Sequence, residues 1–346
     1  MSGNDYRESL RRYRPKVYVN GGEVRSVADE PQLAPGVNAI ALTYDYALRE
    51  EFAPLMRSTT GNRMLAVPRS SQDLLNKLEA VRLVCQQTGC AQRYLAGDAF
   101  AAILSATHQL DSELQTDYGD RFSAYLDHAW SEDLAIGIAM TDPKGDRTER
   151  PAAQANPDSY LHIVTRRHDG LVLRGAKAIV TGAPYMHELL VMPCRNMTEM
   201  DADYAVCCAV PIDAPGLTLV ARPAGRPGEA AAMFSGRYGQ STAVAIFDDV
   251  FVPWARVFLA GEWRYSSTFT YEYATHHRHT CIAARAGFGD LLIGAGALMT
   301  EANGIDLDRA DNVRDSMRLV DSKAVIYFGN GVMRSWMDIV RSWARV

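Results

Sequence analysis

The chain has 346 residues, of which 47% are apolar and 22% charged, and its formal net charge is −5. This composition excludes a largely disordered chain, and the acidic balance argues against a nucleic-acid binder, which would need a basic face. The most apolar run, residues 291–299, is far shorter than the roughly 20 residues that span a bilayer, so we expect no membrane segment.

The N-terminus lacks the apolar segment of a secretory signal. The chain contains six cysteines, too few for a disulfide framework at this length. Free thiols in a reducing cytoplasm are therefore expected.

Residues 1–133 form a first block that should be mainly helical after an irregular N-terminal arm. Residues 70–73 read SSQD, which is typical of a helix start, and apolar residues then recur at helical spacing from Leu74 to Val84. Further helices are predicted from Phe100 to Leu110 and over residues 122–134.

Residues 134–260 form a second block of short strands. The pair Asp169-Gly170 predicts a hairpin turn, because Asp-Gly tolerates the positive φ of a tight reversal. The short spacings favour antiparallel pairing, and no G-x-G-x-x-G motif supports a dinucleotide fold. Strands are predicted at 160–165, 171–180, 189–193, 204–210, 217–221 and 242–247.

Residues 261–346 form a third, helical block. Its last segment carries apolar residues three or four positions apart, which predicts one long apolar stripe. The stripe must be covered by the preceding helix, over residues 280–302, or by another subunit. Its members are Val313, Met317, Val320, Ala324, Phe328, Val332, Trp336 and Val340.

Several motifs of the second block occur in a characteristic order. Residues 140–147 read MTDPKGDR, residues 174–177 read RGAK, residues 181–183 read TGA, and residues 246–254 read IFDDVFVPW. With these motifs the chain resembles the flavin-dependent family of 4-hydroxyphenylacetate 3-monooxygenases and 4-hydroxybutyryl-CoA dehydratases. The resemblance covers nearly the whole chain.

The resemblance implies an α+β multidomain fold of the acyl-CoA dehydrogenase type. It consists of N-terminal helices (1–133), a central antiparallel β-barrel (134–260) and a C-terminal helical bundle (261–346) that is incomplete here. It also implies FAD held between the barrel and the bundle, usually in a homotetramer, so we expect a homo-oligomer. The cofactor-binding residues that it implies are Thr141, Lys144, Arg147, Thr181, Gly182 and Ala183, although residues 142–145 could equally form a simple turn.

The dehydratase branch holds an iron–sulfur cluster with three cysteines and one histidine. These four positions fall on Cys90, Tyr94, His277 and Ala284, so two of the ligands are replaced. Because a cubane cluster needs about four soft donors, we expect no iron–sulfur cluster and no metal. A zinc site at His277 and Cys281 is the less favoured alternative.

On the substrate side we select His277, Arg93, Tyr94 and Gln92. The favoured function is an FAD-dependent two-component monooxygenase, which hydroxylates a small phenolic or conjugated substrate with O2 and reduced flavin from a separate reductase. The first alternative is a cluster-free flavin lyase or isomerase on an acyl thioester, in which His277 removes a proton and Gln92 positions the carbonyl. The second is a flavin-free binding or structural subunit, and His277 could also be purely structural.

Overall fold

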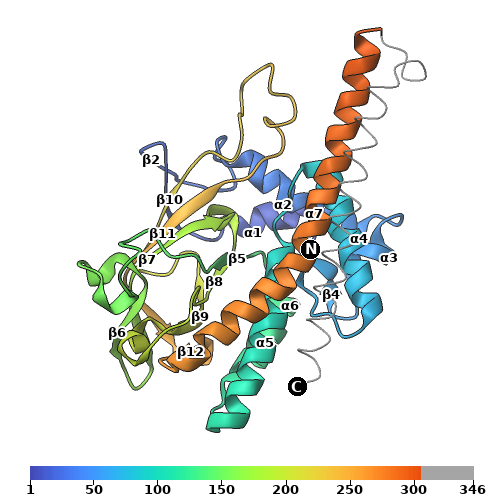
Figure 1. Ribbon diagram of the computed structural model, residues 1–346. Coiled ribbons are helices and arrows are strands. Elements are labelled where there is room, and N and C mark those ends of the chain that lie inside the picture. Colours follow the sequence, from blue (N-terminus) through green and yellow to red (C-terminus); the bar gives the residue numbers. More distant parts are fainter. Residues whose placement is uncertain (305–346) are drawn as a thin grey trace.

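A computed structural model describes residues 1–304 (Figure 1). The apolar stripe predicted between residues 313 and 340 lies outside them. The α-helices are α1 (Gly3–Leu10), α2 (Ala34–Leu48), α3 (Ala53–Met56), α4 (Ser71–Thr88), α5 (Tyr94–Leu114), α6 (Tyr118–Ser131) and α7 (Ser266–Ala302). The strands are β1 (Lys16–Val19), β2 (Gly22–Glu23), β3 (Arg57–Ser58), β4 (Gly61–Asn62), β5 (Ile136–Ala139), β6 (His162–Arg166), β7 (Gly170–Thr181), β8 (Glu188–Val191), β9 (Val206–Pro211), β10 (Leu217–Ala221), β11 (Thr242–Pro253) and β12 (Val257–Ala260).

The helices of the first block follow the predicted apolar spacing. The side chain of Ser70 caps α4 by accepting a hydrogen bond from the Asp73 N–H at 3.1 Å. The buried positions of α5 include Phe100, Ile103 and Leu110, which confirms that helix and places its apolar stripe in the core. The third predicted helix is α6, which begins four residues earlier than expected.

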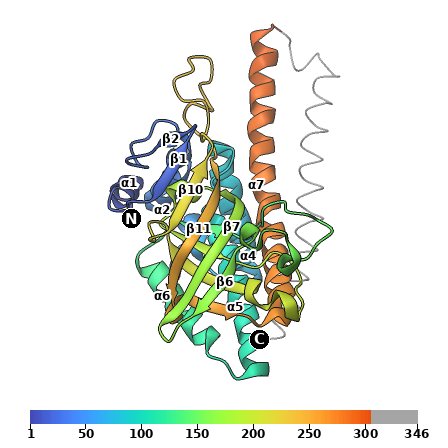
Figure 2. The ribbon, with the colours of Figure 1, turned by 90° about the vertical axis from the view of Figure 1, so that its left-hand side faces the viewer.

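The central strands form two sheets rather than the expected closed antiparallel barrel, so the barrel prediction is wrong. One sheet has the order β2-β1-β10-β11-β7-β6 and the other the order β12-β9-β8-β5. Figure 2 shows the strands of the first sheet side by side. Two pairings, β1 with β10 and β5 with β8, are parallel. The predicted hairpin is confirmed, since β6 and β7 pair antiparallel and the Arg167 N–H donates to the Gly170 carbonyl at 2.8 Å.

The N-terminal arm, which was expected to be irregular, contributes to the central sheet. Lys16 lies opposite Thr218 and Val19 opposite Ala221 in the β1–β10 pair. Val17 and Val19 are buried in the main apolar core, which also includes residues of α5, α6 and both sheets. The first helical block and the strand block therefore share one core.

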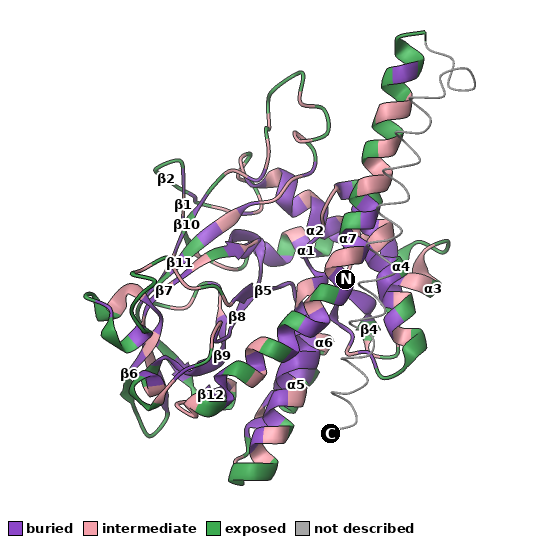
Figure 3. Cartoon of the chain, viewed as in Figure 1, coloured by how far each residue is buried: buried purple, intermediate pink, exposed green. Residues whose placement is uncertain are grey.

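Helix α7 runs for 37 residues along α4 and α5. Its first half is mostly buried and its second half mostly exposed, as the purple and the green and pink segments of Figure 3 show. Within residues 1–304, the stretch Trp263–Ala302 has the length and apolar content that a membrane span requires, by these two measures alone. The absence of a membrane segment therefore stays a prediction.

Candidate functional site

The TDP segment at residues 141–143 is fixed to β7 by a buried ion pair. The Lys177 ammonium donates to the Asp142 carboxylate at 2.7 Å and to the Met140 and Met192 carbonyls at 2.9 Å each. The side chains of Lys177 and Asp142 are only 4% and 5% exposed. The Ala178 N–H donates to the Thr141 carbonyl at 2.9 Å, so this segment lies along the last residues of β7.

The TGA segment follows at the end of β7. Gly182 has a φ of +74°, which favours glycine, and its N–H donates to the Ser241 carbonyl at 2.9 Å. A Cβ on Gly182 would lie 2.5 Å from Met186 Cε and 3.1 Å from Gln92 Oε1. Strand β7 thus holds Thr141 and Asp142 beside Lys177 and Ala178 and ends at residues 181–183, with Gln92 beside Gly182. We call residues 141–147 and 181–183 together the β7 corner.

The β7 corner carries donors that suit a flavin nucleotide. Thr141 is exposed and Thr181 half-buried, whereas Ala183 is buried. Lys144 and Arg147 are exposed cations on the same segment. The Gln92 side chain is 3% exposed, and its Nε2 has no hydrogen-bond partner among residues 1–304. Buried amide groups are normally paired, so this nitrogen could donate to an acceptor of a bound group, and exposed cations could pair with a pyrophosphate.

The turn between α4 and α5 brings Gln92 and Tyr94 to one thiol. The side chains of Cys85, Tyr94 and Gln92 lie beside the Cys90 thiol, and each acts to lower its pKa. The hydrogen bond from Cys85 lowers the pKa of Cys90, although burial opposes it. Burial raises the pKa of Tyr94 well above its usual range, so its hydroxyl stays protonated.

Arg93, expected on the substrate side, has a structural environment instead. Its side chain is fully buried, and its guanidinium lies 3.7 Å from the Tyr44 ring centroid. It donates to the Asp133 carboxylate and to the backbone carbonyls of Asp133 and Leu134. These contacts join α2, α5 and the end of α6 and give Arg93 a packing role. Its Nη1 has no partner among residues 1–304, so its place on the substrate side stays a prediction.

His277 is held by a buried carboxylate from another helix. Its Nδ1 lies 3.4 Å from Asp98 Oδ2, and the other carboxylate oxygen accepts from Lys77 Nζ at 2.9 Å. The Thr280 hydroxyl also donates to Asp98. Burial alone would lower the pKa of His277, but hydrogen bonds with Asp98 and Cys281 raise it to about 10. Asp98 has its pKa lowered by Lys77, His277 and Thr280 against the effect of burial.

Cys281 lies one helical turn after His277 on the same face of α7. The hydrogen bond from His277 is the main effect that lowers the pKa of this thiol, and Arg285 adds to it. Ala284, at the position of the fourth cluster ligand, is buried and offers no donor. Within residues 1–304, no group of three or more His, Cys, Asp or Glu side chains is arranged to hold a metal ion. The absence of an iron–sulfur cluster stays a prediction.

A second histidine, His187, contacts a serine but is oriented the wrong way to activate it. Its Nδ1 accepts from the Ala135 N–H at 2.9 Å, so the proton of the neutral ring is on Nε2. Nε2 therefore donates to Ser9 Oγ at 2.7 Å, and that hydroxyl donates to the Tyr6 carbonyl at 2.6 Å. A general base would have to accept the serine proton, so this pair is structural.

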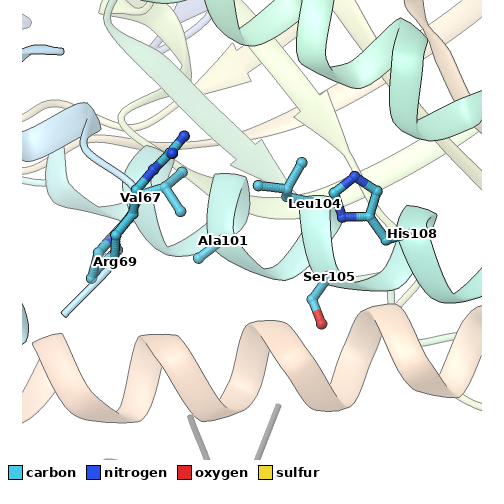
Figure 4. Close-up of a pocket in the computed structure, with 7 residues that line it drawn as sticks. Val67, Arg69, Ala101, Leu104, Ser105 and His108 are labelled. Carbon is cyan, nitrogen blue, oxygen red and sulfur yellow. The ribbon is translucent and has the colours of Figure 1, made fainter. Parts of the chain in front are cut away.

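One cavity of about 340 Å³ lies along α5 (Figure 4). Its α5 residues continue the helix face that carries Asp98, at the three- and four-residue spacing of one stripe. The lining is largely apolar, with two cationic or titratable groups. It consists of Val67, Pro68, Arg69, Ala101, Leu104, Ser105 and His108.

The sequence analysis did not select Lys77, Asp98 or Thr280. Two signals were present. Lys77 interrupts the buried face of α4 next to Leu74 and Leu78, and Asp98 interrupts a run of small and apolar residues in α5. Because buried charges are normally paired, two charged residues on facing apolar stripes indicate an ion pair.

The chain matches two models of known protein families. The model of the 4-hydroxyphenylacetate 3-hydroxylase N-terminal region matches residues 2–259, and that of the C-terminal region matches residues 266–319. The 4-hydroxybutyryl-CoA dehydratase/vinylacetyl-CoA-Δ-isomerase of Clostridium aminobutyricum is 37% identical over 330 residues, which are 92% of this chain and 67% of that protein. The 4-hydroxyphenylacetate 3-monooxygenase oxygenase component of a Geobacillus species is 26% identical over 318 residues, 88% of this chain and 64% of that protein.

Solved structures show the same likeness. The oxygen-tolerant archaeal 4-hydroxybutyryl-CoA dehydratase from N. maritimus superposes with a TM-score of 0.90 at 35% identity, over 96% of this chain and 68% of that one. An oxygenase component of 4-hydroxyphenylacetate 3-monooxygenase, complexed with FAD, has a TM-score of 0.80 at 22% identity, over 94% and 69%, which shows the fold alone. The chain spans about two thirds of the length of these relatives. The resemblance seen in its motifs is confirmed, and the chain belongs to the 4-hydroxyphenylacetate 3-hydroxylase family.

Proposed function

We propose that this chain binds FAD at the β7 corner and acts as the oxygenase component of a two-component flavin monooxygenase. The substrate class is a small phenol or a comparable conjugated molecule, and a separate reductase supplies reduced flavin. Relatives named as oxygenase components act on 4-hydroxyphenylacetate and 4-nitrophenol, which supports this class. Replacement of two cluster ligands by Tyr94 and Ala284 argues in the same direction.

The observation that carries the proposal is the contact between Gly182 and Gln92. The backbone of Gly182 has no room for a side chain, because a Cβ would meet Met186 Cε and Gln92 Oε1. The nitrogen of the same Gln92 amide is buried without a partner among the described residues. Buried amide donors are normally paired, so an unpaired donor on the side chain beside the TGA segment supports a bound acceptor at this place.

The residues around this contact have separate roles in the proposed reaction. Reduced FAD, when bound, supplies the electrons for transfer of one oxygen atom from O2 to the substrate. Gln92 Nε2 donates to a ring or substrate oxygen, and the Tyr94 hydroxyl holds Cys90 in place. His277 is held by Asp98 at Nδ1 and is protonated at neutral pH, so its ring acts as the proton donor to the substrate oxygen.

A redox-neutral lyase or isomerase acting on an acyl thioester is the second candidate. The relative from Clostridium aminobutyricum supports it, because its identity of 37% is higher than the 26% of the monooxygenase component above. The chain also has His277 and Gln92. In this second candidate function His277 removes a proton and Gln92 positions the carbonyl.

Flavin binding is tested with two glycine variants. Gly182→Val is expected to weaken FAD uptake by at least about 10-fold, since the new side chain would meet Met186 and Gln92. Gly228 also has a positive φ, but a Cβ there would meet nothing within 4 Å, so Gly228→Val is the matched control for backbone strain. Uptake is read from the visible absorption of protein purified after incubation with FAD. Equal FAD uptake by both variants, or no FAD uptake by the unaltered chain, would contradict the proposed flavin site.

The reaction is tested with reduced FAD. Oxygen consumption coupled to hydroxylation of 4-hydroxyphenylacetate, used as the probe phenol, is expected for the first candidate, whereas anaerobic conversion of 4-hydroxybutyryl-CoA would favour the second. His277→Gln should lower turnover by about 10²–10⁴-fold in either case while FAD uptake is kept. His168→Gln, at an exposed histidine between β6 and β7, is the control and should leave turnover unchanged.

A further inference from the structure

A row of three polar side chains ends the central sheet next to the TGA segment. Strands β10, β11 and β7 lie side by side (Figure 2), and Thr242 of β11 is opposite Thr181 of β7. The Arg222 N–H donates to the Thr242 carbonyl at 3.1 Å, which extends the β10–β11 pair by one residue. Because residues opposite each other point to the same face of a sheet, the three side chains lie in one row. Thr181 and Thr242 are half-buried, and Arg222 is exposed.

The guanidinium of Arg222 is fixed in this row without an anionic partner. Its Nε donates to Thr242 Oγ1 at 3.0 Å, and within residues 1–304 it has no ion pair and no other hydrogen bond. The backbone is fixed as well, since the Ser241 hydroxyl donates to the Arg222 carbonyl at 2.6 Å and the Gly182 N–H donates to the Ser241 carbonyl at 2.9 Å. The two terminal nitrogens of Arg222 therefore form a free fork, which matches the oxygens of a carboxylate or phosphate.

Two other arginines of the same sheet show this fork occupied. Arg174 of β7 donates through Nε and Nη2 to the two carboxylate oxygens of Asp249, at 3.0 Å and 2.8 Å. Arg166 of β6 pairs with Asp203 at 2.6 Å. Arg222 differs because its anchor is a neutral hydroxyl, which fixes the guanidinium and leaves its charge uncompensated.

An exposed apolar row lies next to the polar row on the same face. Val220 pairs with Val244, and Ile179 lies opposite Val244 at a register shift of β7. The exposed fractions of Val220, Val244 and Ile179 are 48%, 36% and 62%. Ile179 has a φ of +58°, which a β-branched residue rarely adopts, and such strain often occurs where a ligand binds. The two rows together present an apolar surface beside a fixed cation.

We propose that Arg222 and Thr242 form an oxyanion-binding site beside the β7 corner. The ligand has a ring that covers Val244 and Ile179 and a carboxylate or phosphate group that the Arg222 fork holds. This inference rests on the proposed function, because the oxyanion belongs either to the phosphates of the flavin nucleotide or to a carboxylate on the phenolic substrate. Thr242 is a positioning residue, since it acts through Arg222.

Equilibrium binding to the full chain separates the two sources of the oxyanion. FAD, FMN and riboflavin share the flavin ring and differ in phosphate, whereas 4-hydroxyphenylacetate and 4-methylphenol differ in the carboxylate. Flavin fluorescence reports binding of the first three probes, and titration calorimetry that of the two phenols. Arg222→Gln is expected to weaken binding of FAD and FMN, or of 4-hydroxyphenylacetate, by about 10–100-fold. Riboflavin and 4-methylphenol should keep their affinities.

Three further variants separate recognition of the oxyanion from a structural effect. Arg222→Lys keeps the charge without the fork, so its affinity should lie between those of the unaltered chain and Arg222→Gln. Thr242→Val removes the acceptor of Nε at nearly constant size and should weaken only the oxyanion-bearing probes, by about 3–10-fold. Arg226→Gln is the control, because Arg226 is exposed in the loop after β10 and pairs with Glu229 at 3.7 Å. It should leave all affinities unchanged.

Two results would overturn the oxyanion site. The first is unchanged affinity for all five probes in a folded Arg222→Gln chain, with folding checked by circular dichroism. The second is an equal loss for riboflavin and 4-methylphenol, which would show general damage to the site. Inorganic pyrophosphate keeps the two proposals separable. If it binds the unaltered chain but not Arg222→Gln, while no flavin binds, the flavin proposal fails and the oxyanion site stands.

Discussion

At the scale of single residues, the ammonium group of Lys177 has the most consequential contacts. It donates to three oxygen atoms, on Met140, Asp142 and Met192, and has no direct role in the proposed chemistry. Removal of one partner from a buried ion pair leaves an uncompensated charge, which typically costs about 3–5 kcal/mol.

We therefore predict that Lys177→Met lowers the free energy of unfolding by about 3–5 kcal/mol and weakens FAD uptake, because Asp142 would no longer anchor the TDP segment. The measurement is urea unfolding at neutral pH, with the flavin absorbance followed in parallel. Lys144→Met is the matched control, because Lys144 is exposed on the same segment. Its stability should change by less than about 0.5 kcal/mol; a similar loss in both variants would contradict the anchoring role.

His187 gives a prediction for pH dependence. Burial lowers its pKa to about 3, against about 6.5 in an unfolded chain. The unfolded chain therefore takes up a proton that the folded chain resists, so the stability due to this group is complete above pH 6.5 and decreases as the pH falls toward 3. The loss is about 1.4 kcal/mol per pH unit, or about 2 kcal/mol between pH 6.5 and 5.

The variant His187→Asn should remove this part of the slope, since an amide does not titrate. Unfolding free energies of both chains at several pH values between 5 and 7 provide the test, and the difference between the two slopes isolates His187 from the other buried histidines. Identical slopes would show that the ring is not held neutral.

Three consecutive residues illustrate what a sequence can predict about a site. The motif placed Gln92, Arg93 and Tyr94 together on the substrate side. At the start of α5 these three side chains diverge. Gln92 and Tyr94 lie beside Cys90. Arg93 instead packs on Tyr44 and forms an ion pair with Asp133. Neighbouring residues in a helix point about 100° apart, so a motif fixes which residues are near a site better than which of them face it.

At the scale of elements, the contact between α4 and α7 depends on one glycine. A Cβ at Gly287 would lie 2.4 Å from the Arg82 carbonyl oxygen and 2.9 Å from Cys85 Cβ. At Gly294, further along α7, a Cβ would meet nothing within 4 Å. The two glycines therefore respond in opposite directions to the same substitution.

Gly287→Ala is predicted to destabilise the chain by about 1–3 kcal/mol, because backbone on α4 has to move. Gly294→Ala should stabilise it by about 0.5–1 kcal/mol through helix propensity. Thermal and urea unfolding of the two variants would check the signs. A gain in stability from both substitutions would mean that α4 and α7 are not in close contact.

Most helices and strands could be predicted from the sequence, and the errors in strand pairing have one cause. Helices α4 and α5 and strand β10 follow from apolar spacing and turn residues within short windows. Strands β1 and β5 are four residues each and pair in parallel with strands far along the chain. Local patterns do not report such non-local pairs, so the short spacings favoured antiparallel pairing throughout. The barrel was implied by the family resemblance, and two separate sheets occur instead.

At the scale of the whole molecule, the arrangement of helices, sheets and a long final helix was anticipated by the motifs of residues 140–147 and 246–254. The network formed by Lys77, Asp98 and His277 was not predicted by these motifs. It joins three helices, and no short window of the sequence contains more than one of its members. Only the packing of α4, α5 and α7 against one another brings the three charges together.

The position of β1 in the sheet has a consequence for biosynthesis. Lys16 emerges from the ribosome early, yet the residue that it faces, Thr218, belongs to a strand translated much later. During that interval the nascent chain must carry β1 with only its β2 edge paired, and the edge that later meets β10 remains open. The N-terminal arm can therefore complete its pairing only after β10 has been synthesised. A ribosome stalled before that point would hold a chain in which the β10 edge of β1 is still unpaired.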